Sequence, residues 1–154
     1  MKKLFLISTA LIALTGSAFA QQAPTVVKPD ALKWADVPVL PKGAQTATLV
    51  GDPTKAGELY VVRLKVPANY QVPPHTHPYA QQVITVISGS FGLGHGDKLE
   101  KKGELLKAGS VVIHAGMTPH YVWTGNEETI IQVEGIGPGV GITYLNPADD
   151  PRKK

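Results

Sequence analysis

The sequence predicts an all-β protein, built as a sandwich or a closed barrel. Short β-prone runs follow one another with turn signals between them, and few segments have the period of an amphipathic helix. The chain contains 16 glycines and 13 prolines, which suit many tight turns. One run alternates clearly, because Tyr60, Val62, Leu64 and Val66 project to one face of an extended strand while Arg63 projects to the other.

The chain is expected to divide into an arm, one domain and a tail. Residues 21–44 are rich in proline and aperiodic, so we expect an extended arm, with Trp34, Val39 and Leu40 packed on the domain. Residues 45–145 form the predicted barrel domain, a length that suits one core. Residues 146–154 form the predicted C-terminal tail, whose charged side chains are expected to be solvated.

The strands of the domain are predicted from β-prone runs between glycine, proline and asparagine signals. Their ends are uncertain by about two to four residues. The expected strands are 46–50, 58–66, 82–88, 90–94, 104–107, 110–114, 120–124, 128–134 and 141–145.

The first twenty residues have the pattern of a secretory signal peptide. Lys2 and Lys3 form a basic start, residues 4–14 are almost continuously apolar, and residues 18–20 read Ala-Phe-Ala, a cleavage site of the A-x-A kind. The apolar run is too short for an ordinary membrane span. We therefore expect cleavage after Ala20 and a periplasmic or secreted mature protein that is not held in a membrane.

The composition excludes several classes of protein. The chain has no cysteine, so a disulfide scaffold, a cysteine–zinc site and a cysteine nucleophile are all ruled out. It has 15 basic and 12 acidic residues, and two of the basic ones lie in the predicted signal peptide, so the mature chain is nearly neutral. No basic stripe is present, and nucleic-acid binding is not expected.

A pair of histidines is the most informative feature for function. His75 and His77 are two residues apart after Pro73-Pro74, and in an extended chain they project to the same face. Their imidazoles can converge on one ion, and the stiff Pro-Pro step reduces the freedom lost when they do. His120 lies in a later segment punctuated by glycine and proline.

These residues resemble the sequence motifs of the cupins, small jelly-roll barrels also called double-stranded β-helices. The first cupin motif reads G, five residues, H-x-H, three or four residues, E, six residues, G. Here Asn69 is followed at matching spacing by His75, His77, Gln82 and Gly89. The spacing agrees throughout, but Asn69 replaces the usual glycine and Gln82 the usual glutamate.

A second, weaker match covers the segment around His120. The second cupin motif reads G, five residues, P-x-G, two residues, H, three residues, N. The counterpart runs from Gly109 through His114 to His120, with His114 in the usual proline position and Thr124 in place of asparagine. The spacing differs by one residue on each side of the His114-Ala115-Gly116 step. The resemblance covers roughly residues 45–145 and is nearest to small secreted single-domain cupins.

The resemblance implies a metal site inside the barrel. By position, His75, His77 and His120 would be imidazole ligands of a divalent transition metal such as iron, manganese, nickel or zinc, which this ligand set does not distinguish. Gln82, in the glutamate position, offers only a neutral amide oxygen, so it would be a weak ligand or a hydrogen-bond partner of a bound water. Three neutral imidazoles would leave open positions for water, dioxygen or substrate.

Three hypotheses for function remain open at this stage. The leading one is a metal-dependent enzyme acting on a small molecule, of the oxygenase, isomerase or lyase type, although no general base can be named. The second is a non-catalytic protein that binds a small ligand, which the missing carboxylate favours. The third is a structural homodimer with an empty barrel.

Two further histidines and two aromatic residues near the second motif also have expected positions. His114 is either a fourth nitrogen ligand or proton carrier, or a solvated or hydrogen-bonded histidine at the rim, and the rim position is favoured. His95 is interpreted as an exposed residue of a hairpin tip. Tyr121 and Trp123 alternate with the face of His120, so they are expected outside the barrel or at a subunit contact.

Overall fold

The computed structural model describes residues 24–78 and 81–154, and the predicted signal peptide, residues 1–20, lies outside them. The regular secondary structure of the described part is almost entirely β-strand, which confirms the predicted fold class. Its strands are β1 (Ala35–Asp36), β2 (Gln45–Val50), β3 (Leu59–Val66), β4 (Gln71–Thr76), β5 (Gln82–Ser88), β6 (Ser90–His95), β7 (Leu106–Lys107), β8 (Val111–His114), β9 (His120–Thr124), β10 (Thr129–Ile136) and β11 (Thr143–Tyr144). Short 3-10 helices are η1 (Pro29–Ala31), η2 (Pro147–Asp149) and η3 (Pro151–Lys153).

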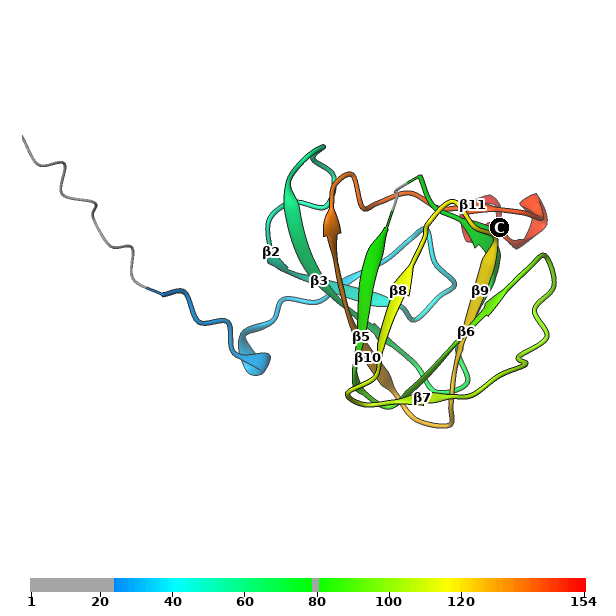
Figure 1. Ribbon diagram of the computed structural model, residues 1–154, viewed down its shortest axis with the longest axis horizontal. Helices are drawn as coiled ribbons and strands as arrows, with labels where there is room; N and C mark the ends of the chain where they lie inside the picture. The colour runs from blue at the N-terminus through cyan, green and yellow to red at the C-terminus, as the bar shows by residue number, and fades with distance from the viewer. Residues whose placement is uncertain (1–23, 79–80) are drawn as a thin grey trace, which may run out of the picture.

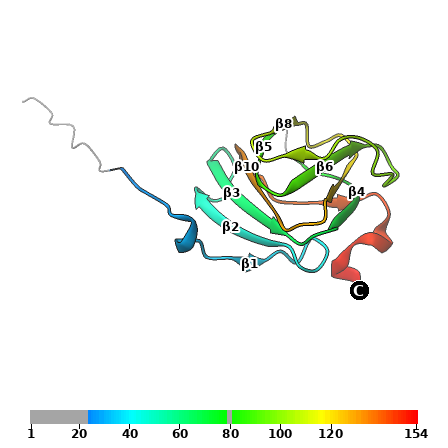
Figure 2. The ribbon, with the colours of Figure 1, turned by 90° about the horizontal axis from the view of Figure 1, so that it is seen from below.

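The strands form two antiparallel sheets that face each other (Figures 1 and 2). One sheet has six strands in the order β1-β2-β3-β10-β5-β8, and the other has five in the order β11-β4-β9-β6-β7. Several neighbouring strands come from distant parts of the chain, as the pairing of β3 with β10 shows, whereas β2 and β3 are consecutive. Within the described residues, 24–78 and 81–154, no helix is long and apolar enough to cross a membrane.

Strand β4 carries His75, is followed directly by His77, and was not among the predicted strands. Its prolines, Pro73 and Pro74, lack the N–H group that a ladder hydrogen bond needs, so the run does not read as a strand. The structure places them in an irregularity of the β4–β9 ladder, where the register shifts between Val72 and His75. β4 therefore pairs with β9 before and after the two prolines, which have no partner in the ladder themselves.

This shift in register determines where His75 points. Val72 pairs with Val122 and His75 pairs with His120, so three steps along β4 correspond to two along β9. In a regular strand Val72 and His75, an odd number of residues apart, would face opposite sides of the sheet. The extra residue corrects the phase, and both side chains line the barrel interior.

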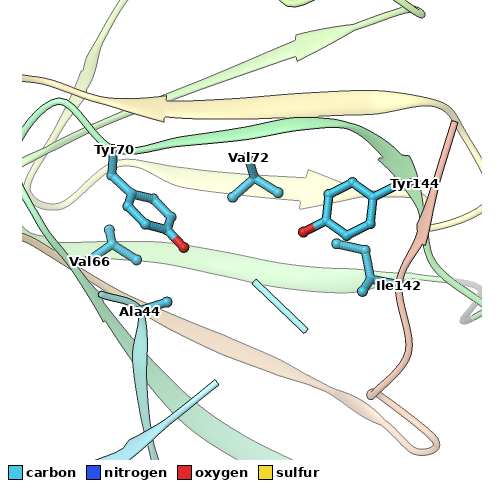
Figure 3. Close-up of a cluster of buried hydrophobic side chains, with 6 residues drawn as sticks. All are labelled: Ala44, Val66, Tyr70, Val72, Ile142 and Tyr144. Carbon is cyan, nitrogen blue, oxygen red and sulfur yellow. The ribbon is translucent and has the colours of Figure 1, made fainter. Parts of the chain in front are cut away.

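Two groups of buried side chains fill the space between the sheets. One group contacts both sheets near the predicted site and consists of Tyr60, Ile84, Val86, Phe91, Ile131 and Val133. The other lies toward the N-terminal segment and is shown in Figure 3; it consists of Ala44, Val66, Tyr70, Val72, Ile142 and Tyr144. Val39 and Leu40 pack against this second group. The segment before β2 also contributes β1, which pairs with β2 and was not predicted.

Tyr121 and Trp123 were expected to pack outside the barrel or at a subunit contact, and the fold of the single chain already buries both side chains. They alternate with His120 and Val122, but the single chain leaves only 3% of Tyr121 and 5% of Trp123 exposed. Their rings lie over β6, where a Cβ on Gly92 would be 2.1 Å from the Trp123 ring. Glycine is therefore required there, because the ring occupies the space that any side chain would need.

The predicted solvated tail is also partly wrong. Asp150 is 7% exposed, and its carboxylate accepts from the Arg152 Nε at 2.8 Å and Nη2 at 2.7 Å. Arg152 Nη2 also donates to the carbonyl of Ile142 at 3.4 Å. The paired charges let the tail fold back against the barrel, whereas Lys153 and Lys154 are exposed as expected.

Candidate metal centre

The structure brings His75, His77 and His120 together at one end of the barrel. His75 lies near the end of β4, His77 follows that strand directly, and His120 begins β9. Because His75 and His120 are opposite partners across the ladder, their ring centroids are 4.2 Å apart. The His77 ring lies 4.8 Å from that of His75. One ring nitrogen from each of the three lies within 4.8 Å of the others.

Backbone carbonyls fix the orientation of the three rings. Nδ1 of His75 lies 2.6 Å from the carbonyl of Pro73, Nδ1 of His120 lies 2.9 Å from that of Thr118, and Nδ1 of His77 lies 2.7 Å from that of Gly141. A carbonyl oxygen only accepts, so Nδ1 carries the proton in each ring. In the neutral tautomer the lone pair is then on Nε2, the arrangement that metal-binding histidines use.

Burial keeps these rings neutral at physiological pH. Burial, with a smaller contribution from the neighbouring histidines, lowers the pKa of His75 to about 4 and that of His120 to about 2. The pKa of His77 is also lowered, mainly by burial. A neutral imidazole has the lone pair that a metal needs, so the three residues fit a divalent transition metal.

Gln82, the first residue of β5, lines the barrel interior together with the three histidines. Its side chain is 6% exposed, and its Nε2 donates to the hydroxyl of Tyr60 and, at 3.4 Å, to the carbonyl of Gly139. Burial raises the pKa of Tyr60, so its hydroxyl stays protonated. The position where a cupin glutamate would stand thus holds a neutral amide fixed by two neighbours.

His114 is not the solvated or hydrogen-bonded rim residue that was favoured from the sequence. It is the last residue of β8, opposite Gln82 in the β5–β8 ladder, and only 3% of it is exposed. Its ring centroid is 3.9 Å from that of His120, and its Nε2 has no hydrogen-bond partner in the described part of the chain. Burial lowers its pKa to about 4. This ring nitrogen is available to hydrogen-bond a ligand or a water molecule in the barrel.

His95 is exposed, as expected, although it ends β6 and does not lie within the turn that follows. It pairs with His120 across the β6–β9 ladder, and its ring centroid is 6.1 Å from that of His114. All five histidines of the chain therefore gather at one end of the barrel.

A cavity of about 250 Å³ opens beside these histidines. His75, His77, His114, His120 and Gln82 all line it. The rest of its wall comes chiefly from aliphatic and aromatic side chains on the inner faces of both sheets. The cavity gives a small molecule a place next to the cluster.

The segment at 137–141 was not assigned a role from the sequence. The carbonyl of Gly141 orients His77, and the carbonyl of Gly139 accepts from Gln82. Its glycines and proline identify it only as a loop, and no sequence signal ties a loop carbonyl to a particular histidine. This contribution becomes visible only when β11, which follows the segment, is paired with β4, and β10, which precedes it, is paired with β5.

The fold defined by these sheets is the double-stranded β-helix of the cupins, as the motifs implied. Solved structures with the same architecture match most of the chain. The polyketide cyclase RemF from Streptomyces resistomycificus has 22% sequence identity over 85% of this chain and 92% of its own, with a TM-score of 0.66. An RmlC-like cupin protein from Ralstonia eutropha JMP134 has 18% identity over 87% of this chain and 80% of its own, with a TM-score of 0.60.

A third similar structure is the DMSP lyase DddQ from Ruegeria pomeroyi DSS-3. It has 19% identity over 77% of this chain and 63% of its own, with a TM-score of 0.58. No family model and no curated protein sequence matches the chain. At these identities the likeness shows the fold, and function must be argued from the site.

Proposed function

We propose that the protein binds one divalent transition metal through His75, His77 and His120. The observation that supports this most strongly is the convergence of three ring nitrogens within 4.8 Å, each ring with its Nδ1 bonded to a carbonyl. Iron, manganese, nickel and zinc all accept imidazole ligands, so the ligand set is compatible with each.

The metallated site is proposed to act on a small organic molecule held in the cavity. A bound divalent ion there would supply Lewis acidity toward a carbonyl or carboxylate oxygen, or a place for dioxygen. His114 presents Nε2 beside His120, where it can hydrogen-bond a substrate atom or exchange a proton. Gln82 and Tyr60 would orient the substrate through hydrogen bonds, and neither side chain changes its charge near neutral pH.

An enzyme of the oxygenase, isomerase or lyase type is the leading form of this proposal. The similar structures include a polyketide cyclase and a DMSP lyase, so this fold accommodates enzymes acting on small molecules. The signal-like residues 1–20 support export to the periplasm or beyond.

A non-catalytic binding protein is the second candidate, and one observation favours it. No aspartate or glutamate is among the described residues that line the cavity. Acid–base catalysis beside a metal usually needs a titratable group of suitable pKa, and His114 is the group best placed to serve.

Elemental analysis of the protein, purified without chelator, tests the metal site. We expect close to one transition-metal ion per chain, and reconstitution with iron, manganese, nickel or zinc after chelation. A protein that holds no metal and takes up none on titration would disprove the proposal. Turnover of any carbonyl or carboxylate compound by the metallated wild type, lost on His114→Ala with metal retained, would favour the enzyme over the binding protein.

A further inference from the structure

The cavity beside the candidate metal centre is polar at one end and apolar elsewhere. Away from the histidines its wall includes the inward side chains of Val62, Leu64, Leu93 and Val122. These four are only partly buried although they face the barrel interior. None of the described lining residues is an aspartate, glutamate, lysine or arginine. The wall thus offers no charged partner for a phosphate, an ammonium group or a second carboxylate.

The N-terminal segment closes one side of this apolar space. Val37, Val39 and Leu40 line the cavity, although they precede the barrel in the chain. Tyr144 donates its hydroxyl proton to the carbonyl of Val39 at 2.9 Å, and the hydroxyl of Tyr70 donates to the carbonyl of Pro41. In Figure 3 the two tyrosines lie on either side of Val72 with their hydroxyl groups turned toward each other.

Two hydroxyl groups of this apolar part, on Tyr70 and Thr124, are already engaged, and Thr46 and Thr48 of β2 add two further hydroxyls to the lining. The hydroxyl of Tyr70 is bonded to the N-terminal segment, and Thr124 Oγ1 donates to the carbonyl of Pro67 at 2.8 Å. A ligand with many hydroxyl groups, such as a sugar, would find few partners there and would lose its own hydration. An apolar ligand would instead cover the partly exposed aliphatic wall, which is favourable.

We propose that the ligand is an apolar compound with a single oxygen-bearing head, a carboxylate or a carbonyl. The head would lie at the histidine end and the apolar body between β3, β9 and Val39–Leu40. A cavity of about 150 Å³ accepts benzene, so the 250 Å³ here suits a body on the order of ten non-hydrogen atoms. This inference names the substrate class of the site proposed above and rests on that proposal for the position of the head.

Calorimetric titration of octanoate and acetate into Zn²⁺-loaded and metal-free protein tests the inference. The two probes share a carboxylate and differ by six methylene groups, each of which is worth roughly four-fold in affinity when buried. We expect octanoate to bind the loaded protein at least about 100-fold more tightly than acetate, allowing for incomplete burial. Removal of zinc should weaken octanoate binding by at least about tenfold, because the head loses its partner.

Leu64→Trp fills the cavity from the middle of β3. We expect it to take up zinc with unchanged stoichiometry and to bind octanoate no better than acetate. Val111→Trp is the matched control, because Val111 is 58% exposed on strand β8 of the same sheet. If Leu64→Trp does not fold, Leu40→Ala enlarges the cavity instead and should shift the preference from octanoate toward longer carboxylates.

The possible failures are distinguishable. Zinc uptake with equal affinity for octanoate and acetate would overturn the substrate class and leave the metal site standing. Equal octanoate binding with and without zinc would overturn the placement of the head. Absence of metal uptake would overturn the proposed function itself.

Discussion

Introducing a carboxylate at position 82, where the cupin motif has glutamate, tests whether this position faces the candidate metal centre. Gln82 is 6% exposed, and its amide donates to Tyr60 and Gly139. In Gln82→Glu the Tyr60 hydroxyl can turn and donate to the new carboxylate, but the Gly139 carbonyl then faces an oxygen. The variant therefore places one buried negative charge, with one hydrogen-bond donor, beside the histidine cluster.

The expected effects have opposite signs in the metal-free and the metal-bound protein. Burial with few donors raises a glutamate pKa, and a rise of about two units above its usual value costs about 2–3 kcal/mol at pH 7. We expect the metal-free variant to lose roughly that much unfolding free energy. A bound divalent ion neutralises the same charge, so metal affinity should rise by about 10–100-fold, or about 1.4–2.7 kcal/mol.

Urea denaturation of the metal-free protein and competition with a calibrated chelator measure the two quantities. Gln81→Glu is the matched control, because Gln81 is the exposed neighbour immediately before β5. It adds the same charge outside the cavity and should change both quantities little. If Gln82→Glu leaves stability and metal affinity as they are in the control, position 82 does not face the metal centre and the reasoning is wrong.

Three further predictions follow from the same geometry. His120→Ala should abolish stoichiometric metal uptake in elemental analysis, whereas His95→Ala should retain it, and equal losses would mean that the ligands are misplaced. Tyr144→Phe removes the hydrogen bond to the Val39 carbonyl and should lower the unfolding free energy in urea by about 0.5–1.5 kcal/mol; an unchanged value would show that the N-terminal segment is not held there. In the metal-free protein His75 has a pKa of about 4, whereas its unfolded form titrates near 6.5. Below pH 6.5 the unfolded state then binds protons that the native state does not. The unfolding free energy should therefore fall by about 1.4 kcal/mol for each such ring with each unit that the pH is lowered from 6.5 toward 4. Urea curves that coincide at pH 7 and pH 5 would contradict this.

The sequence was sufficient for the fold class because strand alternation and turn residues are local signals. Tyr60, Val62, Leu64 and Val66 do face the interior, as their alternation predicted. Strand β4 was missed for a physical reason: a proline run removes the donors that a ladder uses, and only the partner strand β9 shows that the chain pairs around it. Local preference was overridden by tertiary pairing.

For the candidate centre, the sequence identified which residues meet but not how their environment alters them. Spacing placed His75 and His77 on one face, and the motif brought in His120. The burial of His114 depends on packing between β8 and β9, which no spacing encodes. The carbonyl of Gly141 is equally invisible in sequence, because every residue has a carbonyl and only the fold selects this one.

The neutral character of the centre connects its chemistry to the ligand that it would accept. His75, His77, His120 and Gln82 contribute no negative charge, so the double charge of a bound ion would not be offset by the protein. In a cavity with few polar partners such a charge is costly, and an anionic oxygen entering from outside would relieve that cost. In a cupin whose metal is bound by a glutamate, the protein supplies that anion, whereas here the bound small molecule would supply it. Glutamine at position 82 thus weakens the protein's own set of metal ligands and at the same time favours a substrate with a carboxylate head. The reverse change, Gln82→Glu, should therefore weaken octanoate binding while it strengthens metal binding.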